Sequence, residues 1–176
     1  MSNDEGSISV EIRDHIFLMG LNRPEKYNGI TPKMLAELVS AYTQLDEDDD
    51  LRVGVLFGHG DHFTAGLDLP KWTERMERND RSSSKENSKV DPFGFGRSCR
   101  KPIVTAVQGI TFTFGIEVAL AGDIIVAAND CRFSQLEPAR GIHATGGATF
   151  RFVERAAGET LCTICLLAMN LMPPRL

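Results

Sequence analysis

The sequence predicts an α/β fold with a largely parallel sheet. Two observations support this: short apolar segments of strand length recur along the chain, and segments of helical length and periodicity separate them. The 176 residues, 42% hydrophobic and 24% charged, have ordinary globular composition. This is enough apolar material for one cored domain, which we expect over most of the chain.

Two strands and a helix are expected first. Residues 7–21, SISVEIRDHIFLMGL, are typical of two short strands with a tight turn at Arg13 and Asp14. Residues 31–48 have the period of an amphipathic helix, with Thr31 as N-cap and Pro32 at the first helical position. The acidic run DEDDD, residues 46–50, is expected to be a solvated helix end, because a hard-cation loop needs ligands at alternate positions together with a glycine for its turn.

Three further apolar segments are predicted to be strands buried on both faces. They are VGVLFG, KPIVTAVQG and DIIVAA, and GIEVALAG between the last two has the length of a connecting helix. Residues 74–91 are rich in serine, asparagine and both signs of charge. We expect a surface loop, a frayed helix or a lid over a site there.

Two glycine-containing loops are placed where open α/β sheets bind ligands. GHGDHFTAGLDL and VQGITFTFGIE each follow a predicted strand, so their backbone N–H groups lie beyond its carboxyl end. Neither loop matches a dinucleotide or phosphate-binding motif. The second loop leads into the helix that carries Glu117, and the positive end of that helix suits a developing oxyanion.

Glu117 is the most informative single residue. It stands among apolar and small residues in GIEVALAG, and a second acid, Glu137, follows after a short polar stretch. Because isolated acids are rarely left in a core without a partner, a glutamate in this position either lies outside the predicted core or is kept for chemistry.

Charge and targeting patterns exclude other classes. The formal net charge is −5, from 19 basic and 24 acidic residues, and no basic cluster is interleaved with aromatic residues, so no nucleic-acid partner is expected. The N-terminus lacks a secretion signal and no apolar run is long enough to span a bilayer, so we predict a cytoplasmic protein with no membrane association.

Four segments resemble successive signatures of the enoyl-CoA hydratase/isomerase (crotonase) family, in the family's order. They are LNRPEKYNGITPKMLAEL, GHGDHFTAGLDL, QGITFTFGIEVALAGDIIVAA and RFSQLEPARGIHATGGATFR, and the similarity covers Ile8 to Ala156. The resemblance implies a crotonase-like spiral of ββα turns, an acyl-CoA thioester substrate and a homo-trimer or hexamer. It implies no metal and no separate cofactor, because coenzyme A is part of the substrate.

The resemblance assigns roles to the two acids. Glu117 and Glu137 match the family's catalytic glutamates, at the family's spacing of 137 − 117 = 20 residues. The implied reaction is syn addition of water to a 2-enoyl-CoA, with Glu117 acting mainly on the water and Glu137 mainly on the proton delivered to C2. The backbone N–H groups of Leu67 and Phe114 match the oxyanion hole.

Six residues match the family's substrate groove. By the same matching, contacts to the substrate and its CoA moiety are expected from Lys26, Tyr27, Ala65, Gly66, Asp68 and Gly115. Two structural alternatives stand beside these roles: Asp68 caps the following helix, and Lys26 is a solvated turn residue.

The sequence departs from the family pattern at the acyl site. Thr113 and Phe114 stand where glycines are usual, so backbone freedom is reduced and a ring lies near the acyl group. The loop GIHATGG lacks the proline often found near Ala144, and SQLE replaces QPE before Glu137. Acyl specificity therefore does not follow from the resemblance.

The end of the chain is predicted to be aberrant. We expect a core domain over residues 1–156, and a tail over residues 157–176, AGETLCTICLLAMNLMPPRL, in place of the family's C-terminal helices. Codons can be chosen so that this tail, read in another frame, spells the family-like WGNAMYNLFAGDEFDAAEA. We therefore expect a frameshift near Ala156, which makes Cys162 and Cys165 accidents of frame.

Loss of the terminal helices affects the expected activity. Apolar faces left in water forfeit about 25 cal/mol per Å², which is serious for a fold of about 5–15 kcal/mol net stability. We therefore expect weak or no activity and a tendency to aggregate. Two alternatives to hydration remain: a truncated, silent remnant that binds acyl-CoA, and an isomerase of the same family.

Overall fold

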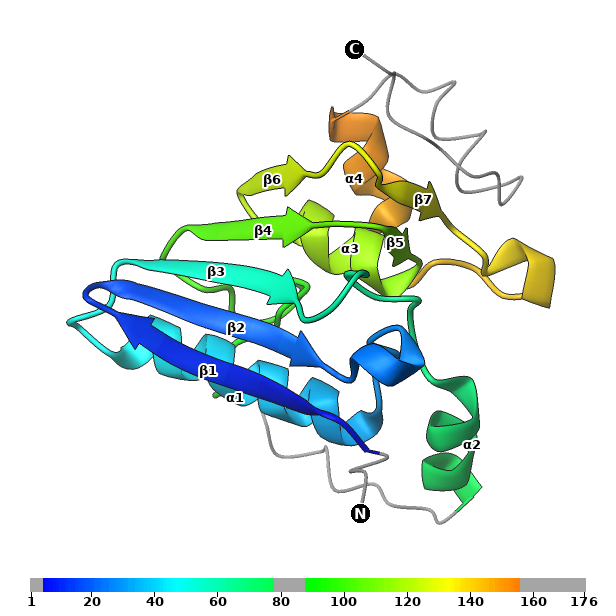
Figure 1. The fold of residues 1–176 in the computed structure, drawn as a ribbon, viewed down its shortest axis with the longest axis horizontal. Coiled ribbons are helices and arrows are strands. Elements are labelled where there is room, and N and C mark those ends of the chain that lie inside the picture. The colour runs from blue at the N-terminus through cyan, green and yellow to red at the C-terminus, as the bar shows by residue number, and fades with distance from the viewer. Residues whose placement is uncertain (1–4, 78–87, 156–176) are drawn as a thin grey trace.

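The computed structural model describes residues 5–77 and 88–155 (Figure 1). Strands and helices alternate along the chain. In order, the elements are β1 (Ser7–Arg13), β2 (Ile16–Asn22), η1 (Pro24–Lys26), α1 (Pro32–Glu47), β3 (Val53–Gly58), α2 (Leu69–Glu77), β4 (Ile103–Val107), β5 (Ile110–Phe112), α3 (Phe114–Ala121), β6 (Ile124–Ala127), β7 (Arg132–Ser134), η2 (Pro138–Arg140) and α4 (Ala148–Arg155).

The strands form two sheets that share a spiral. The larger has the order β1-β2-β3-β4-β6, antiparallel at β1–β2 and parallel elsewhere, and the smaller pairs β5 with β7 in parallel. The units β4-β5-α3 and β6-β7-α4 are successive turns of one spiral, since each contributes one strand to each sheet and then a helix. The α/β class and the ββα spiral are confirmed.

Helix α1 closes one face of the large sheet (Figure 1). Its apolar stripe includes Met34, Leu38 and Leu45, which are fully buried in the same core as Phe17 and Met19 of β2. The Thr31 hydroxyl accepts the Met34 N–H at 3.2 Å, and Pro32 is the first helical residue. The predicted N-terminus of this helix is confirmed.

The first strand pair differs from expectation by one residue at its turn. Arg13 is the last residue of β1, paired with Ile16, and the turn consists of Asp14 and His15. Asp14 takes the left-handed conformation (φ 52°), which aspartate tolerates better than most residues.

The expectation that three strands are buried on both faces is wrong. β3 alternates between buried and half-buried residues, and in β6 the side chains of Ile124 and Val126 are 55% and 56% exposed. α1 covers one face of the large sheet, whereas none of the described helices covers the face that carries Ile124 and Val126. Continuous apolar sequence therefore does not mean two-sided burial here.

The acidic run at the end of α1 is not uniformly solvated. Asp46 is fully buried and binds Arg97 Nη2 at 2.6 Å, the Arg100 backbone N–H at 2.7 Å and Arg100 Nε at 3.1 Å. Burial by itself would raise the pKa of Asp46, but these hydrogen bonds and the arginine charges outweigh it and lower the pKa to about 2. Asp46 thus anchors the segment that precedes β4.

Two predictions fall wholly or partly outside the described residues. Helix α2 accounts for the start of the charged stretch predicted over residues 74–91, and residues 78–87 lie outside. The tail over residues 157–176, with Cys162 and Cys165, also lies outside, so the frameshift stays a prediction.

Candidate active site

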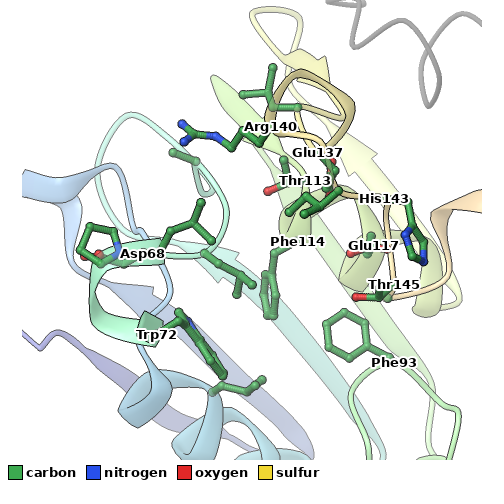
Figure 2. A pocket seen from close by; sticks show the side chains of 18 of the residues that line it. Asp68, Trp72, Phe93, Thr113, Phe114, Glu117, Glu137, Arg140, His143 and Thr145 are labelled. Atoms are coloured by element: carbon green, nitrogen blue, oxygen red, sulfur yellow. The ribbon is translucent and has the colours of Figure 1, made fainter. Parts of the chain in front are cut away.

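A cavity of about 620 Å³ opens where the second loop, η2 and α2 meet. Figure 2 shows Asp68 and Trp72 on one side, Phe93 and His143 on the other, and Phe114 between them. Apolar and polar side chains both line it: Leu35, Ala65, Leu67, Asp68, Leu69, Pro70, Trp72, Phe93, Phe95, Thr113, Phe114, Glu117, Leu136, Glu137, Arg140, Ile142, His143, Thr145 and Gly146.

Glu117 enters the cavity from the first turn of α3 and is 5% exposed. Its Oε1 accepts the backbone N–H of Ala148 at 3.4 Å. Burial raises the pKa of Glu117, while the backbone N–H groups of Ala148, Gly146 and Gly147 and the charge of Arg151 oppose the shift. These groups favour the carboxylate, whereas desolvation favours the acid.

Glu137 lies directly before η2 and is 9% exposed. Burial raises the pKa of Glu137, its own backbone N–H opposes this, and the charge of Glu117 raises it further. With its amide oriented to donate, Gln135 places Nε2 2.8 and 3.0 Å from the two carboxylate oxygens of Glu137. The two acids therefore share one cavity and influence each other's protonation.

The two loops present backbone N–H groups at the cavity. Ile30 donates its N–H to Gly66 O at 2.8 Å and Asp68 donates to Ile30 O at 3.0 Å, which fixes the chain on both sides of Leu67. Within residues 5–77 and 88–155, the N–H groups of Leu67 and Phe114 donate to no protein acceptor. Both residues line the cavity, so both donors are available to a ligand.

Thr113 holds a conformation that a β-branched residue rarely adopts. Its φ is 47° and its ψ −112°, outside the regions allowed to most side chains. Its Oγ1 lies only 1.9 Å from the position that a Cβ on Gly66 (φ 103°) would take. The close approach of the two loops therefore depends on Gly66 having no side chain.

Six of the ten residues predicted for the site line the cavity, namely Ala65, Leu67, Asp68, Phe114, Glu117 and Glu137. The other four are not among the lining residues. Lys26 is an exposed residue of η1, and Tyr27 is 54% exposed and accepts the Ala65 N–H through its carbonyl at 2.9 Å. Gly66 packs against Thr113, and Gly115 against Phe63 and Thr64.

Asp68 has structural contacts in addition to its place in the cavity. Its Oδ2 accepts Arg23 Nη1 at 2.7 Å, and the Arg23 side chain is 1% exposed. Its Oδ1 accepts the Lys71 N–H at 3.4 Å, so the helix-capping alternative agrees with the geometry. The Arg23 ion pair escaped sequence reasoning because no local signal marks a buried arginine.

Sequence reasoning also missed much of the lining. Trp72 is fixed by its Nε1, which donates to Ile30 O at 2.9 Å, and Phe93 meets the Phe114 ring edge-to-face at 5.3 Å. Arg140 and His143 add basic residue types to the lining of the cavity. The single tryptophan and the aromatic pair in PFGF were visible signals, but their convergence was not.

A family model described as Enoyl-CoA hydratase/isomerase matches residues 11–175. The chain belongs to this family. It is 29% identical over 163 residues to an enoyl-CoA hydratase of Mycobacterium tuberculosis, covering 92% of this chain and 61% of that protein. It is 34% identical over 157 residues to a mevalonyl-coenzyme A hydratase of Aspergillus fumigatus, covering 89% and 57%.

A solved structure supports the crotonase fold. The probable enoyl-CoA hydratase/isomerase from Mycobacterium abscessus superposes with a TM-score of 0.85 at 38% identity, covering 94% of this chain and 63% of that one. The chain thus spans about three fifths of the length of these relatives. Among the residues that the structure describes, no helix is both long and apolar enough to cross a bilayer.

Proposed function

We propose that the protein is an enoyl-CoA hydratase-like enzyme that adds water syn across a 2-enoyl-CoA thioester. One observation carries the proposal: Glu117 and Glu137 are both buried, both have raised pKa values and both line one cavity. Family membership and the hydratase names of the relatives support it at a coarser level.

The surroundings of the two acids support different roles for them. Backbone N–H groups and Arg151 favour ionised Glu117, and the Glu117 charge in turn favours protonated Glu137. In the proposed reaction Glu117 takes a proton from the water that attacks C3, and Glu137 gives its proton to C2. A later exchange with solvent returns each acid to its starting state.

The thioester oxygen gains negative charge as the water adds. We propose that the N–H groups of Leu67 and Phe114 hold it, since neither has a protein acceptor in the described part of the chain. Losing one such donor typically costs about 3–4 kcal/mol of barrier. The reaction needs no separate cofactor, and we propose a homo-trimer or hexamer in the cytoplasm, which gel filtration and cell fractionation test.

Hydration of crotonyl-CoA, followed by loss of the enoyl absorbance, tests the proposal. Glu117→Gln and Glu137→Gln should each reduce kcat by about 10²–10⁴-fold. Glu154→Gln, at an exposed glutamate of α4, is the matched control and should leave kcat unchanged. A kcat that stays at the wild-type value in Glu117→Gln or in Glu137→Gln contradicts the mechanism.

The same wild-type protein and glutamate variants distinguish two other functions of this site. Acyl-CoA binding without turnover indicates the silent remnant. Conversion of 3-enoyl-CoA to 2-enoyl-CoA that depends chiefly on one of the two glutamates indicates an isomerase.

A further inference from the structure

Arg151 connects three parts of the cavity wall. It lies on α4, and its guanidinium carbon is 4.9 Å from the centroid of the Phe150 ring and 5.3 Å from that of Phe95. Nη1 donates to Gly146 O at 2.8 Å, and Nη2 donates to Phe93 O. One side chain therefore ties α4 to the aromatic segment 93–95 and to the turn at Gly146.

The turn that Arg151 holds is the turn that binds Glu117. The carbonyl of Gly146 accepts from Arg151, while the N–H groups of Gly146, Gly147 and Ala148 favour ionised Glu117. A Cβ on Gly147 (φ 104°) would lie 2.2 Å from Arg151 Nη1, so the absence of a side chain there makes room for the guanidinium.

The aromatic segment that Arg151 holds lines the same cavity. The Phe93 ring packs edge-to-face on Phe114 at an interplanar angle of 84°, and a Cβ on Gly146 would lie 2.8 Å from Phe93 Cε1 and 2.7 Å from Glu117 Oε2. We call Phe93, Phe95 and Phe114 the aromatic wall of the cavity. This wall and the Glu117 carboxylate therefore both approach Gly146. Both side-chain hydrogen bonds of Arg151 end on segments that adjoin this point.

We propose that Arg151 is a positioning residue that holds the aromatic wall against the acyl group and holds the turn Gly146–Ala148 against the Glu117 carboxyl group. The acyl role rests on the proposed function, whereas the effect on Glu117 does not. The other charged or titratable groups that face the cavity with Glu117 are Glu137, His143, Arg140 and Asp68.

Carboxyl ¹³C NMR titration of the purified chain tests the electrostatic part without requiring turnover. Arg151→Met should raise the pKa of Glu117, assigned with Glu117→Gln, by at least about half a unit, a threefold change in the ionisation constant. Arg151→Lys keeps the positive charge and should shift the pKa of Glu117 less than Arg151→Met does. Arg155→Met is the matched control, because Arg155 lies one turn away on α4 and binds only Gly122 O at 2.7 Å among the partners described.

Fluorescence of Trp72, the single tryptophan, tests the aromatic wall with saturated acyl-CoA esters. Lysine cannot reach two carbonyls and lie over two rings as Arg151 does, so Arg151→Lys should weaken octanoyl-CoA binding at least about threefold and free coenzyme A binding little. If Arg151→Met does not fold, the octanoyl-CoA affinity of the more conservative variant Arg151→Lys still tests the proposal.

Three results overturn the proposal. They are an unchanged Glu117 pKa in folded Arg151→Met, unchanged octanoyl-CoA affinity in Arg151→Lys, and equal effects from Arg155→Met. Failure of the proposed function has a different signature: wild type that binds acyl-CoA but neither hydrates nor isomerises, with the Glu117 titration still sensitive to Arg151.

Discussion

Gln135 is fully buried beside Glu137, with its amide nitrogen 2.8 and 3.0 Å from the two carboxylate oxygens. The Gln135 amide therefore donates to the Glu137 carboxylate across both of its oxygens, and rotation of that carboxyl group breaks both contacts. Gln135 precedes Glu137 by two residues and follows β7 directly, so the strand sets the position of this pair.

Gln135→Leu removes the amide donor and should raise the pKa of Glu137 further. A hydrogen bond to a charged group is worth about 1.5–3 kcal/mol, so we expect kcat for hydration to fall by about 10–100-fold. Gln108→Leu is the matched control, since Gln108 donates to Gly58 O and Gly60 O outside the cavity. Equal losses in both variants would show that Gln135 acts only through stability.

Glu117→Gln should stabilise the protein at neutral pH although it lowers kcat. Because burial raises the folded pKa of Glu117 above its ordinary 4.5, ionisation opposes folding, and wild-type stability falls as the pH rises through the folded pKa. Thermal melting should give Glu117→Gln the higher Tm at pH 7 and equal Tm values near pH 4. A Tm difference between wild type and Glu117→Gln that grows toward low pH contradicts this assignment. The control Glu154→Gln should have the wild-type Tm at both pH values.

Asp46 should have the opposite pH dependence. Its folded pKa of about 2 lies below the ordinary 3.8, so its stabilisation is complete above pH 3.8 and is lost as the pH falls toward 2. Asp46→Asn should cost about 1–2 kcal/mol at pH 7, a modest value because the Arg100 side chain is 74% exposed.

Urea unfolding at pH 7 and pH 3 measures this effect. The difference between wild type and Asp46→Asn should shrink at pH 3. The exposed neighbour Asp49 is the control, and Asp49→Asn should change stability by less than about 0.5 kcal/mol at either pH. A difference that is independent of pH would assign the effect to packing.

The approach of Gly66 to Thr113 should appear as a coupling energy. Gly66→Ala should destabilise by more than about 2 kcal/mol, because the new Cβ meets Thr113 Oγ1 and φ is 103°. Thr113→Gly relieves strain of about 1–3 kcal/mol and should leave stability equal or higher.

The double variant Gly66→Ala/Thr113→Gly should recover part of the Gly66→Ala loss, giving a coupling of about 1–2 kcal/mol by urea unfolding. Thr111→Gly combined with Gly66→Ala is the matched control, since Thr111 is buried two residues earlier and does not meet that Cβ. Additive losses of unfolding free energy in both double variants would mean that the loops carrying Gly66 and Thr113 adjust to the new Cβ without strain.

Local patterns predicted much of the fold. The period of α1, its Thr31 cap and Pro32 were readable because neighbouring residues make these contacts. The segments of β1, β2, β3, β4 and β6 were predicted as strands, whereas β5 and β7 were not. The two-sided burial predicted for β6 is wrong, since exposure depends on which helix covers a face. Asp46 was misjudged for the same reason: its partners Arg97 and Arg100 are more than fifty residues away.

The sequence by itself determined the strands of the large sheet, the helices α1 and α3, the family and the choice of Glu117 and Glu137 as candidates, because these depend on residue order and local periodicity. Only the tertiary structure decided that Gln135 faces Glu137, that Arg151 holds both Gly146 and Phe93, and that Lys26 lies outside the cavity. Those relations depend on how successive ββα turns stack. Burial and the distances between remote groups, which set the pKa values and the shape of the cavity, arise from that stacking.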